Sequence, residues 1–129
     1  MAEEQGIDNT IPHEAEVNIR KLVGNILDPA RERLDFPIFV TSGYRCQKLN
    51  AMLVETDGAS PTSLHRFGMA ADITAIPNVD NRKLLEILKT LPCYELIAYR
   101  PKRFPDRILR FHVAYKEGEK EKTMFSKFV

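Results

Sequence analysis

The residues best suited to chemistry are His65 and Asp72, which lie seven positions apart in the segment SLHRFGMAAD (residues 63–72). Imidazole nitrogens and carboxylate oxygens are common zinc ligands, and a catalytic zinc takes three protein ligands and keeps a fourth position open. Between the two residues, Gly68 permits close backbone approach or a positive φ, and the alanines at 70 and 71 leave room beside a metal ion. The segment therefore predicts part of a metal site. The alternative is a surface or hydrogen-bonded histidine before a strand, with an aspartate that caps it.

A third ligand has to come from elsewhere, and the chain holds three histidines. His112 lies downstream in LRFHVAY (residues 109–115), where apolar residues alternate as in a β-strand. The two predicted faces of this strand are Leu109, Phe111 and Val113 on one side and Arg110, His112 and Ala114 on the other. The apolar face can then pack on helices while His112 looks into a cleft. His13, next to Pro12 near the N-terminus, is the weaker candidate.

Several separated motifs resemble those of a known family and occur in its order. They are TSGYR (41–45), LN (49–50), SPTSLH (60–65), Gly68, AADI (70–73) and FHV (111–113). Together they closely resemble the zinc D-Ala-D-Ala carboxypeptidase family, whose bacterial and phage members cut peptidoglycan stem peptides. That family shares its core fold with the vancomycin-resistance dipeptidases and the Hedgehog signalling domain. The resemblance runs from about residue 6 to residue 115, and it implies that His65, Asp72 and His112 bind zinc.

The resemblance also implies that Arg45 reaches into the cleft. A guanidinium near the metal can stabilise the oxyanion formed when water attacks a peptide carbonyl, or can clamp a substrate carboxylate through two hydrogen bonds. A surface salt bridge is the alternative role for an arginine in a turn. Arg45 follows a predicted strand and the residues Ser42-Gly43-Tyr44, and this position favours a role in the cleft.

The sequence departs from the family pattern where a proton-transferring acid is expected. Many relatives carry an acidic residue shortly before the last histidine or after the preceding strand, but this chain has Leu109 and Tyr99 there. The remaining candidates are Glu95 and Asp106. Glu95 could equally be a solvated carboxylate at a strand end, and Asp106 a turn residue. Reduced activity, an unusual base and loss of catalysis therefore all remain open.

Composition indicates one globular domain over residues 1–129. Hydrophobic residues make up 43% of the chain and charged residues 29%, which is typical of a folded domain, and the net charge of +1 argues against nucleic-acid binding. No apolar run is long enough to span a bilayer, and residues 1–5 lack a secretory signal. We expect a monomer that is synthesised in the cytoplasm and reaches the cell wall after lysis or by assisted export. Cys46 and Cys93 are expected to be buried thiols, with a bridge between them left open.

The residue pattern predicts an α+β domain with a small central antiparallel sheet flanked by helices, as in the Hedgehog/DD-peptidase fold. Helices are expected over 14–34, with Pro29 kinking or restarting the helix near Asp28, over 47–54, and over 81–91 after an Asp80 cap. Strands are expected over 37–42, from about 69 to 74, over 94–99 and over 108–115. The basic loop 100–107 is either a solvated hairpin or a rim that attracts an anionic cell-wall peptide. Residues 123–129 form a short edge strand or remain loose.

Two classes of function fit these features. The first is a zinc peptidase acting on D-amino-acid-containing peptidoglycan peptides, as a carboxypeptidase, dipeptidase or endopeptidase. The second is a zinc-stabilised binding domain without catalysis, for which the missing acid is the reason. Retention of the three ligand positions and of Arg45 favours the peptidase.

Overall fold

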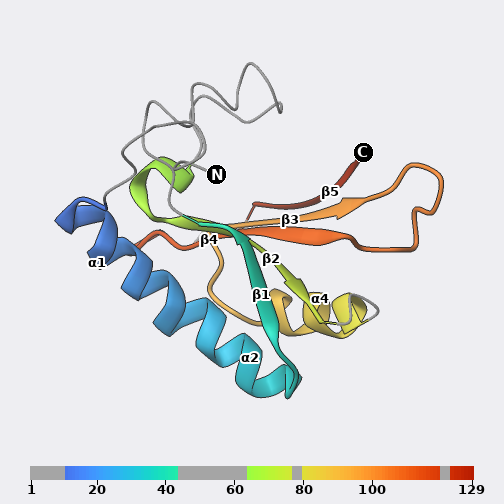
Figure 1. Ribbon diagram of the computed structural model, residues 1–129, viewed down its shortest axis with the longest axis horizontal. Coiled ribbons are helices and arrows are strands. Elements are labelled where there is room, and N and C mark those ends of the chain that lie inside the picture. Colours follow the sequence, from blue (N-terminus) through green and yellow to red (C-terminus); the bar gives the residue numbers. More distant parts are fainter. Residues whose placement is uncertain (1–10, 44–63, 77–79, 120–122) are drawn as a thin grey trace.

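The computed structural model describes residues 11–43, 64–76, 80–119 and 123–129 (Figure 1). The helical elements are α1 (His13–Leu22), the π-helical segment η2 (Val23–Leu27), α2 (Asp28–Leu34), the 3₁₀ turn η3 (Leu64–Phe67) and α4 (Asn81–Lys89). The strands are β1 (Ile38–Ser42), β2 (Ala70–Ala75), β3 (Glu95–Arg100), β4 (Arg110–Ala114) and β5 (Thr123–Phe128). The protein is α+β, as the sequence predicts.

The N-terminal helix runs from α1 to α2 with a change of helical type in the middle. The predicted restart near Asp28 is confirmed, because α2 begins there with Pro29 in its first turn. Proline has no N–H, and its ring clashes with the carbonyl four residues before it, so a continuous α-helix is disfavoured at this point. The wider π-helical turn of Val23–Leu27 precedes the proline. The buried stripe is nevertheless continuous through Ala15, Leu22, Ile26, Ala30 and Leu34.

The sheet has five strands in the order β1-β2-β4-β3-β5. Strands β1 and β2, β2 and β4, and β4 and β3 pair antiparallel, as predicted, but β5 is parallel to β3. The predicted central antiparallel sheet is therefore confirmed for four strands, and residues 123–128 add a parallel strand at its edge. Because β4 is already flanked by β2 and β3, β5 has to join at an edge. The chain reverses direction after β4, and beside β3 this reversed direction is parallel.

One face of the sheet packs against both long helical elements, which Figure 1 shows below the strands. The core that joins them includes Ile26 and Leu34 of the N-terminal helix, Leu84 and Leu88 of α4, and Ile73, Leu96, Phe111 and Val113 of the sheet. The opposite face carries the alternate residues of the same strands. Among them are Asp72 and His112, which are paired across β2 and β4.

The ends of several elements differ from the prediction. Strand β4 begins at Arg110, so the alternation does not extend back to Leu109, and Ile108 joins the core in place of Leu109. Helix α4 ends at Lys89, before the predicted limit of 91. The side chain of Asn81 bonds to the Ala75 N–H and the Ile108 carbonyl, and so ties α4 to the sheet.

The predicted helix over 47–54, Arg45 and Cys46 lie outside the described residues. Cys93 is buried, and its thiol donates to the Leu88 carbonyl at 3.6 Å. Within the described ranges, no helix combines the length and apolar character needed to cross a membrane.

Candidate metal centre

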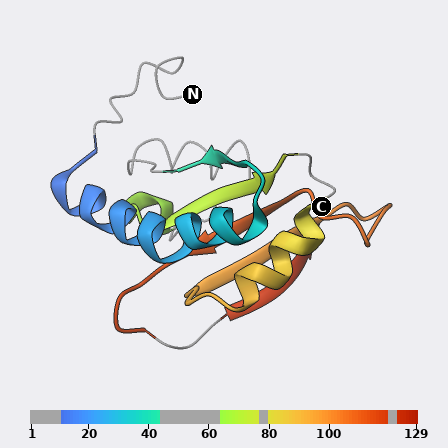
Figure 2. The ribbon, with the colours of Figure 1, turned by 90° about the horizontal axis from the view of Figure 1, so that it is seen from below.

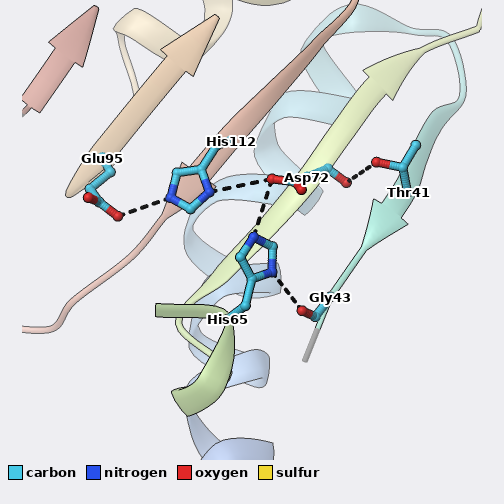
Figure 3. Close-up of polar contacts among 6 residues, drawn as sticks. All are labelled: Thr41, Gly43, His65, Asp72, Glu95 and His112. Carbon is cyan, nitrogen blue, oxygen red and sulfur yellow. Dashed lines mark hydrogen bonds and ion pairs between the residues drawn. The ribbon is translucent and has the colours of Figure 1, made fainter. Parts of the chain in front are cut away.

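Three elements bring His65, Asp72 and His112 together: η3, β2 and β4 (Figure 3). One potential ligand atom from each residue lies within 4.8 Å of those from the other two. Asp72 is paired directly with His112 in the antiparallel register of β2 and β4, so both side chains project from the same face. Both histidines are buried, with 1% of His65 and 8% of His112 exposed. The sequence thus identified a set of residues that is close in space.

Gly68 lets the chain turn from His65 back into β2. Its φ is +70°, and a Cβ atom built there would lie 2.4 Å from the Ala15 carbonyl oxygen of α1 and 2.9 Å from Ile19. Both reasons for a glycine, positive φ and close backbone approach, therefore apply at this position. The turn is held to α1 by a hydrogen bond from Asn18 to the Phe67 carbonyl. Helix α1 thus fixes the height of His65 above the sheet.

The two alanines before Asp72 have different surroundings. Ala71 belongs to the hydrophobic core on the helical side of the sheet. Ala70 pairs with Ala114 and lies on the same face as Asp72, two residues away. The expectation that both alanines leave room beside a metal ion is therefore wrong for Ala71.

The ring of His65 is oriented by a backbone carbonyl. Its Nδ1 lies 2.7 Å from the Gly43 oxygen, which can only accept, so Nδ1 carries the proton and donates it. In the neutral ring the lone pair is then on Nε2, which faces Asp72 Oδ1 at 3.3 Å. Two acceptors that face each other need a proton or a metal ion between them. This arrangement directs the His65 lone pair toward the Asp72 carboxylate.

The ring of His112 lies between two carboxylates (Figure 3). Its Nδ1 is 3.4 Å from Asp72 Oδ1, and its Nε2 is 3.0 Å from Glu95 Oε1. When Nε2–H donates to Glu95, the Nδ1 lone pair of the neutral ring points toward Asp72. A carboxylate behind a ligating histidine is the usual way to fix its tautomer and orientation. Asp72 Oδ1 is therefore the point on which His65 Nε2 and His112 Nδ1 converge.

The cluster is strongly coupled electrostatically. Burial lowers the pKa of His112, but hydrogen bonds to Asp72 and Glu95 outweigh burial and raise this pKa to about 9. Burial raises the pKa of Asp72, but hydrogen bonds from His112 and His65 bring it well below its ordinary value. The hydrogen bond from His112 likewise lowers the pKa of Glu95. Without a metal ion, the cluster therefore holds a proton on His112 between two ionised carboxylates.

The other candidates lie elsewhere. Asp106 is exposed in the loop between β3 and β4, which projects at the opposite end of the sheet from η3 (Figure 2). His13 is exposed at the start of α1. Arg45 lies outside the described residues. Of the two proposed proton carriers, Glu95 is the one that contacts the cluster.

Two contributions, one from β1 and one from the residue directly after it, have no sequence signal of their own. The Gly43 carbonyl orients His65, and the Thr41 hydroxyl donates to the Asp72 carbonyl at 3.2 Å. Between Val40 and Ser42 the register with β2 shifts, as in a β-bulge. A backbone carbonyl is present at every residue, so only the fold shows which one is used. The family motif that includes residues 41–43 was the available hint.

Comparison with known proteins gives one family. Residues 1–105 match the family described as Peptidase M15, and no curated protein sequence matches the chain. The matched range contains His65, Asp72 and Glu95 but ends before His112, which the sheet places opposite Asp72. The match extends over most of the chain and agrees with both the fold and the cluster of side chains that could hold a metal ion. This protein is a member of the M15 family of metallopeptidases.

Proposed function

We propose that this M15 family member is a zinc peptidase that hydrolyses D-amino-acid-containing stem peptides of peptidoglycan. The observation that supports it best is the convergence of His65 Nε2, Asp72 Oδ1 and His112 Nδ1. Two imidazoles and one carboxylate form a set of three protein donors that suits a catalytic zinc. Bound there, zinc would polarise a peptide carbonyl and lower the pKa of water to about 7.

The residues around the ligands hold them in the required state. The Gly43 carbonyl and the Glu95 carboxylate each accept a ring N–H, so the other nitrogen of each imidazole faces Asp72, and zinc would displace the proton that His112 carries there. Neither histidine has to rotate before it can act as a ligand. The burial of both rings excludes competing water. The site is therefore preorganised for a cation.

Glu95 is our choice over Asp106 for the carboxylate that supports hydrolysis. Its contact with His112 at 3.0 Å supports a positioning role, in which Oε1 holds the Nε2–H. The proton-transfer role predicted from the sequence also goes to Glu95, through its second oxygen, because Glu95 begins β3 whereas Asp106 lies in the loop at the other end of the β3–β4 hairpin. Substitution by glutamine separates the two roles, since an amide oxygen can still accept the Nε2–H but cannot take a proton.

Arg45 is proposed as the cation that stabilises the oxyanion or clamps a substrate carboxylate. This role rests on the family motif alone. Lysine would keep the charge but lose the planar two-point contact, so Arg45→Lys should lower turnover far more than zinc binding or folding. An unchanged kcat/KM in an active preparation would instead assign Arg45 to the surface.

The deciding experiment uses the zinc-loaded protein and two kinds of substrate. These are a stem peptide ending in D-Ala-D-Ala and cross-linked muropeptides, with new termini detected by mass spectrometry. A new terminus that His112→Ala does not produce supports the peptidase and identifies the bond that is cut. Stoichiometric zinc binding without cleavage of either substrate would support the zinc-stabilised binding domain instead.

A further inference from the structure

Three side chains form a second feature on the face of the sheet that carries the metal cluster. Tyr99 of β3 is paired with Arg110 of β4 on one side and with Lys127 of β5 on the other. Paired residues of neighbouring strands project from the same face. Arg110 is two residues from His112 on β4, which is about 7 Å along the strand. We call Tyr99, Arg110 and Lys127 the cationic row.

The aromatic ring of Tyr99 is shared by both cations. The guanidinium carbon of Arg110 lies 4.3 Å from the ring centroid, and the Lys127 ammonium lies 5.9 Å from the same centroid. Stacking engages the flat face of a guanidinium and leaves its in-plane N–H groups available to a planar anion. Arg110 is half-buried and Lys127 is exposed. The row therefore presents an oriented guanidinium and a mobile ammonium to solvent.

Neither cation is neutralised by the described part of the chain, where no ion pair involves Arg110 or Lys127. The acidic side chains of this face, Asp72 and Glu95, are both bound to His112. The face thus carries carboxylates at the metal cluster and cations one row further along the strands. A peptide lying across the cluster would meet this positive charge one to two residues from the reacting bond, since an extended peptide advances about 3.3 Å per residue.

We propose that the cationic row is a substrate subsite that binds a carboxylate of the peptide one to two residues from the scissile bond. Arg110 would donate two parallel hydrogen bonds to this carboxylate, and Lys127 would add a second charge from the β5 edge. The proposal rests on the proposed peptidase function and adds a specificity determinant to it. A peptide that carries an amide at this position would lose the charge-assisted contacts.

A matched control lies in the β3–β4 loop, just before β4 begins at Arg110. Arg107 is also a cation over an aromatic ring, with its guanidinium carbon 5.7 Å from the centroid of Phe104. It belongs to the exposed loop between β3 and β4, away from the metal cluster. Removing its charge changes the net charge of the protein as much as removing that of Arg110. A bulk electrostatic effect would therefore be the same for both.

The test compares zinc-loaded wild-type protein with Arg110→Gln, Lys127→Gln and the control Arg107→Gln. Each receives two pairs of stem peptides: in one pair the C-terminal carboxylate is free or amidated, and in the other a side-chain carboxylate is free or amidated. We expect the wild type to prefer the acid in one pair by about tenfold in kcat/KM, through KM. Arg110→Gln should abolish this preference, Lys127→Gln should reduce it about threefold, and Arg107→Gln should leave it unchanged.

Thermal unfolding of each variant checks the fold, and the exposed Lys127 keeps the test valid if Arg110→Gln does not fold. Equal use of acid and amide in both pairs, or a preference that survives both substitutions, would overturn the subsite and leave the peptidase intact.

If no peptide is cleaved, the proposed function fails, and titration of the same peptides by NMR decides the subsite alone. The subsite would be supported if the wild type binds the acid of a pair more tightly than the amide, and if Arg110→Gln or Lys127→Gln removes this difference. Equal or absent binding would overturn it.

Discussion

The two ends of the β3–β4 hairpin carry similar residues in very different surroundings. At one end, Glu95 contacts the buried ring of His112, and hydrogen bonding lowers the pKa of its carboxyl. At the other end, Asp106 is exposed in a loop that also holds Arg103 and Arg107. Asp106 precedes His112 by only six residues, whereas Glu95 precedes His112 by 17. Distance along the chain is thus a poor guide to the site, because adjacent antiparallel strands bring residues together across the hairpin.

The comparison also separates two uses of a charged side chain. Within the cluster, His112 is buried, and its partners Asp72 and Glu95 are partly buried, so removing one partner leaves another charge unpaired at a high cost. In the loop, the charges face water, where a single ion pair contributes little. Substitutions at the two ends should therefore differ strongly in effect, and the following predictions test this difference.

The largest effect is expected at the ligands. His65→Ala and His112→Ala should each lower zinc affinity by roughly 100- to 1,000-fold, because each removes one of three protein donors. The measurement is metal analysis after gel filtration, where the wild type should retain about one zinc per chain. The exposed His13 provides the control, since His13→Ala should keep the wild-type content. A wild-type zinc content in both His65→Ala and His112→Ala would contradict their assignment as zinc ligands.

Gly68→Ala should come next, with a loss of about 2–4 kcal/mol in the free energy of unfolding. The new methyl group meets the Ala15 carbonyl at 2.4 Å, and the positive φ adds a conformational cost. Gly118→Ala is the matched control, because Gly118 has φ +81° and no atom within 4 Å of an added Cβ. In denaturant titration, Gly118→Ala should lose only the conformational cost of a positive φ, about 1–2 kcal/mol in the free energy of unfolding. Equal losses in the two variants would show that the contact with α1 is unimportant.

Glu95→Gln tests the contact at the near end of the hairpin against Asp106→Asn at the far end. We expect kcat/KM to fall about 100-fold in Glu95→Gln and to stay within twofold of the wild type in Asp106→Asn. Zinc content is measured in both variants to separate proton transfer from positioning. Loss of zinc together with activity would point to positioning of His112 alone, and a large loss only in Asp106→Asn would reverse the assignment.

The smallest effect is a dependence on pH that is confined to the cluster. Metal binding displaces the proton of His112, whose pKa is about 9 in the metal-free protein, so zinc affinity should rise about tenfold from pH 7 to pH 8. Stability should change in the opposite sense. A raised pKa stabilises the metal-free fold fully below the ordinary value of 6.5, and this contribution is lost as the pH rises through about 9.

The lowered pKa values of Asp72 and Glu95 act at the other end of the pH range. Their contribution is present above their ordinary values near 4 and is lost as the pH falls through the lowered ones. Both carboxylates stay ionised between pH 6 and pH 10, so the contribution of His112 decides the change over this range. Denaturant titrations of metal-free protein should show greater stability at pH 6 than at pH 10. A zinc affinity that does not change between pH 7 and pH 8 would contradict the protonated state of His112.

Features that depend on short-range pattern could be predicted before the structure was known. The spacing of His65 and Asp72 around Gly68, the strand phase that turns His112 away from the core, and the restart of the helix at Asp28 follow from local periodicity and backbone chemistry. The strand phase and the turn at Gly68 could be predicted because alternation and glycine conformation act within a few positions, and the structure places His65, Asp72 and His112 close together. The same reasoning extended this strand back to Ile108, because no local signal marks its true start at Arg110.

Which distant groups meet depends on the arrangement of the strands in the folded protein. The insertion of β4 between β2 and β3 sets His112 opposite Asp72 and brings Glu95 to its other ring nitrogen, and Gly43, directly after β1, supplies its carbonyl to His65. The parallel pairing of β5 likewise brings Lys127 to Tyr99. Strand order and register depend on the packing of the whole sheet against the helices. Residues far apart in the sequence become neighbours through that packing, and no local pattern encodes it.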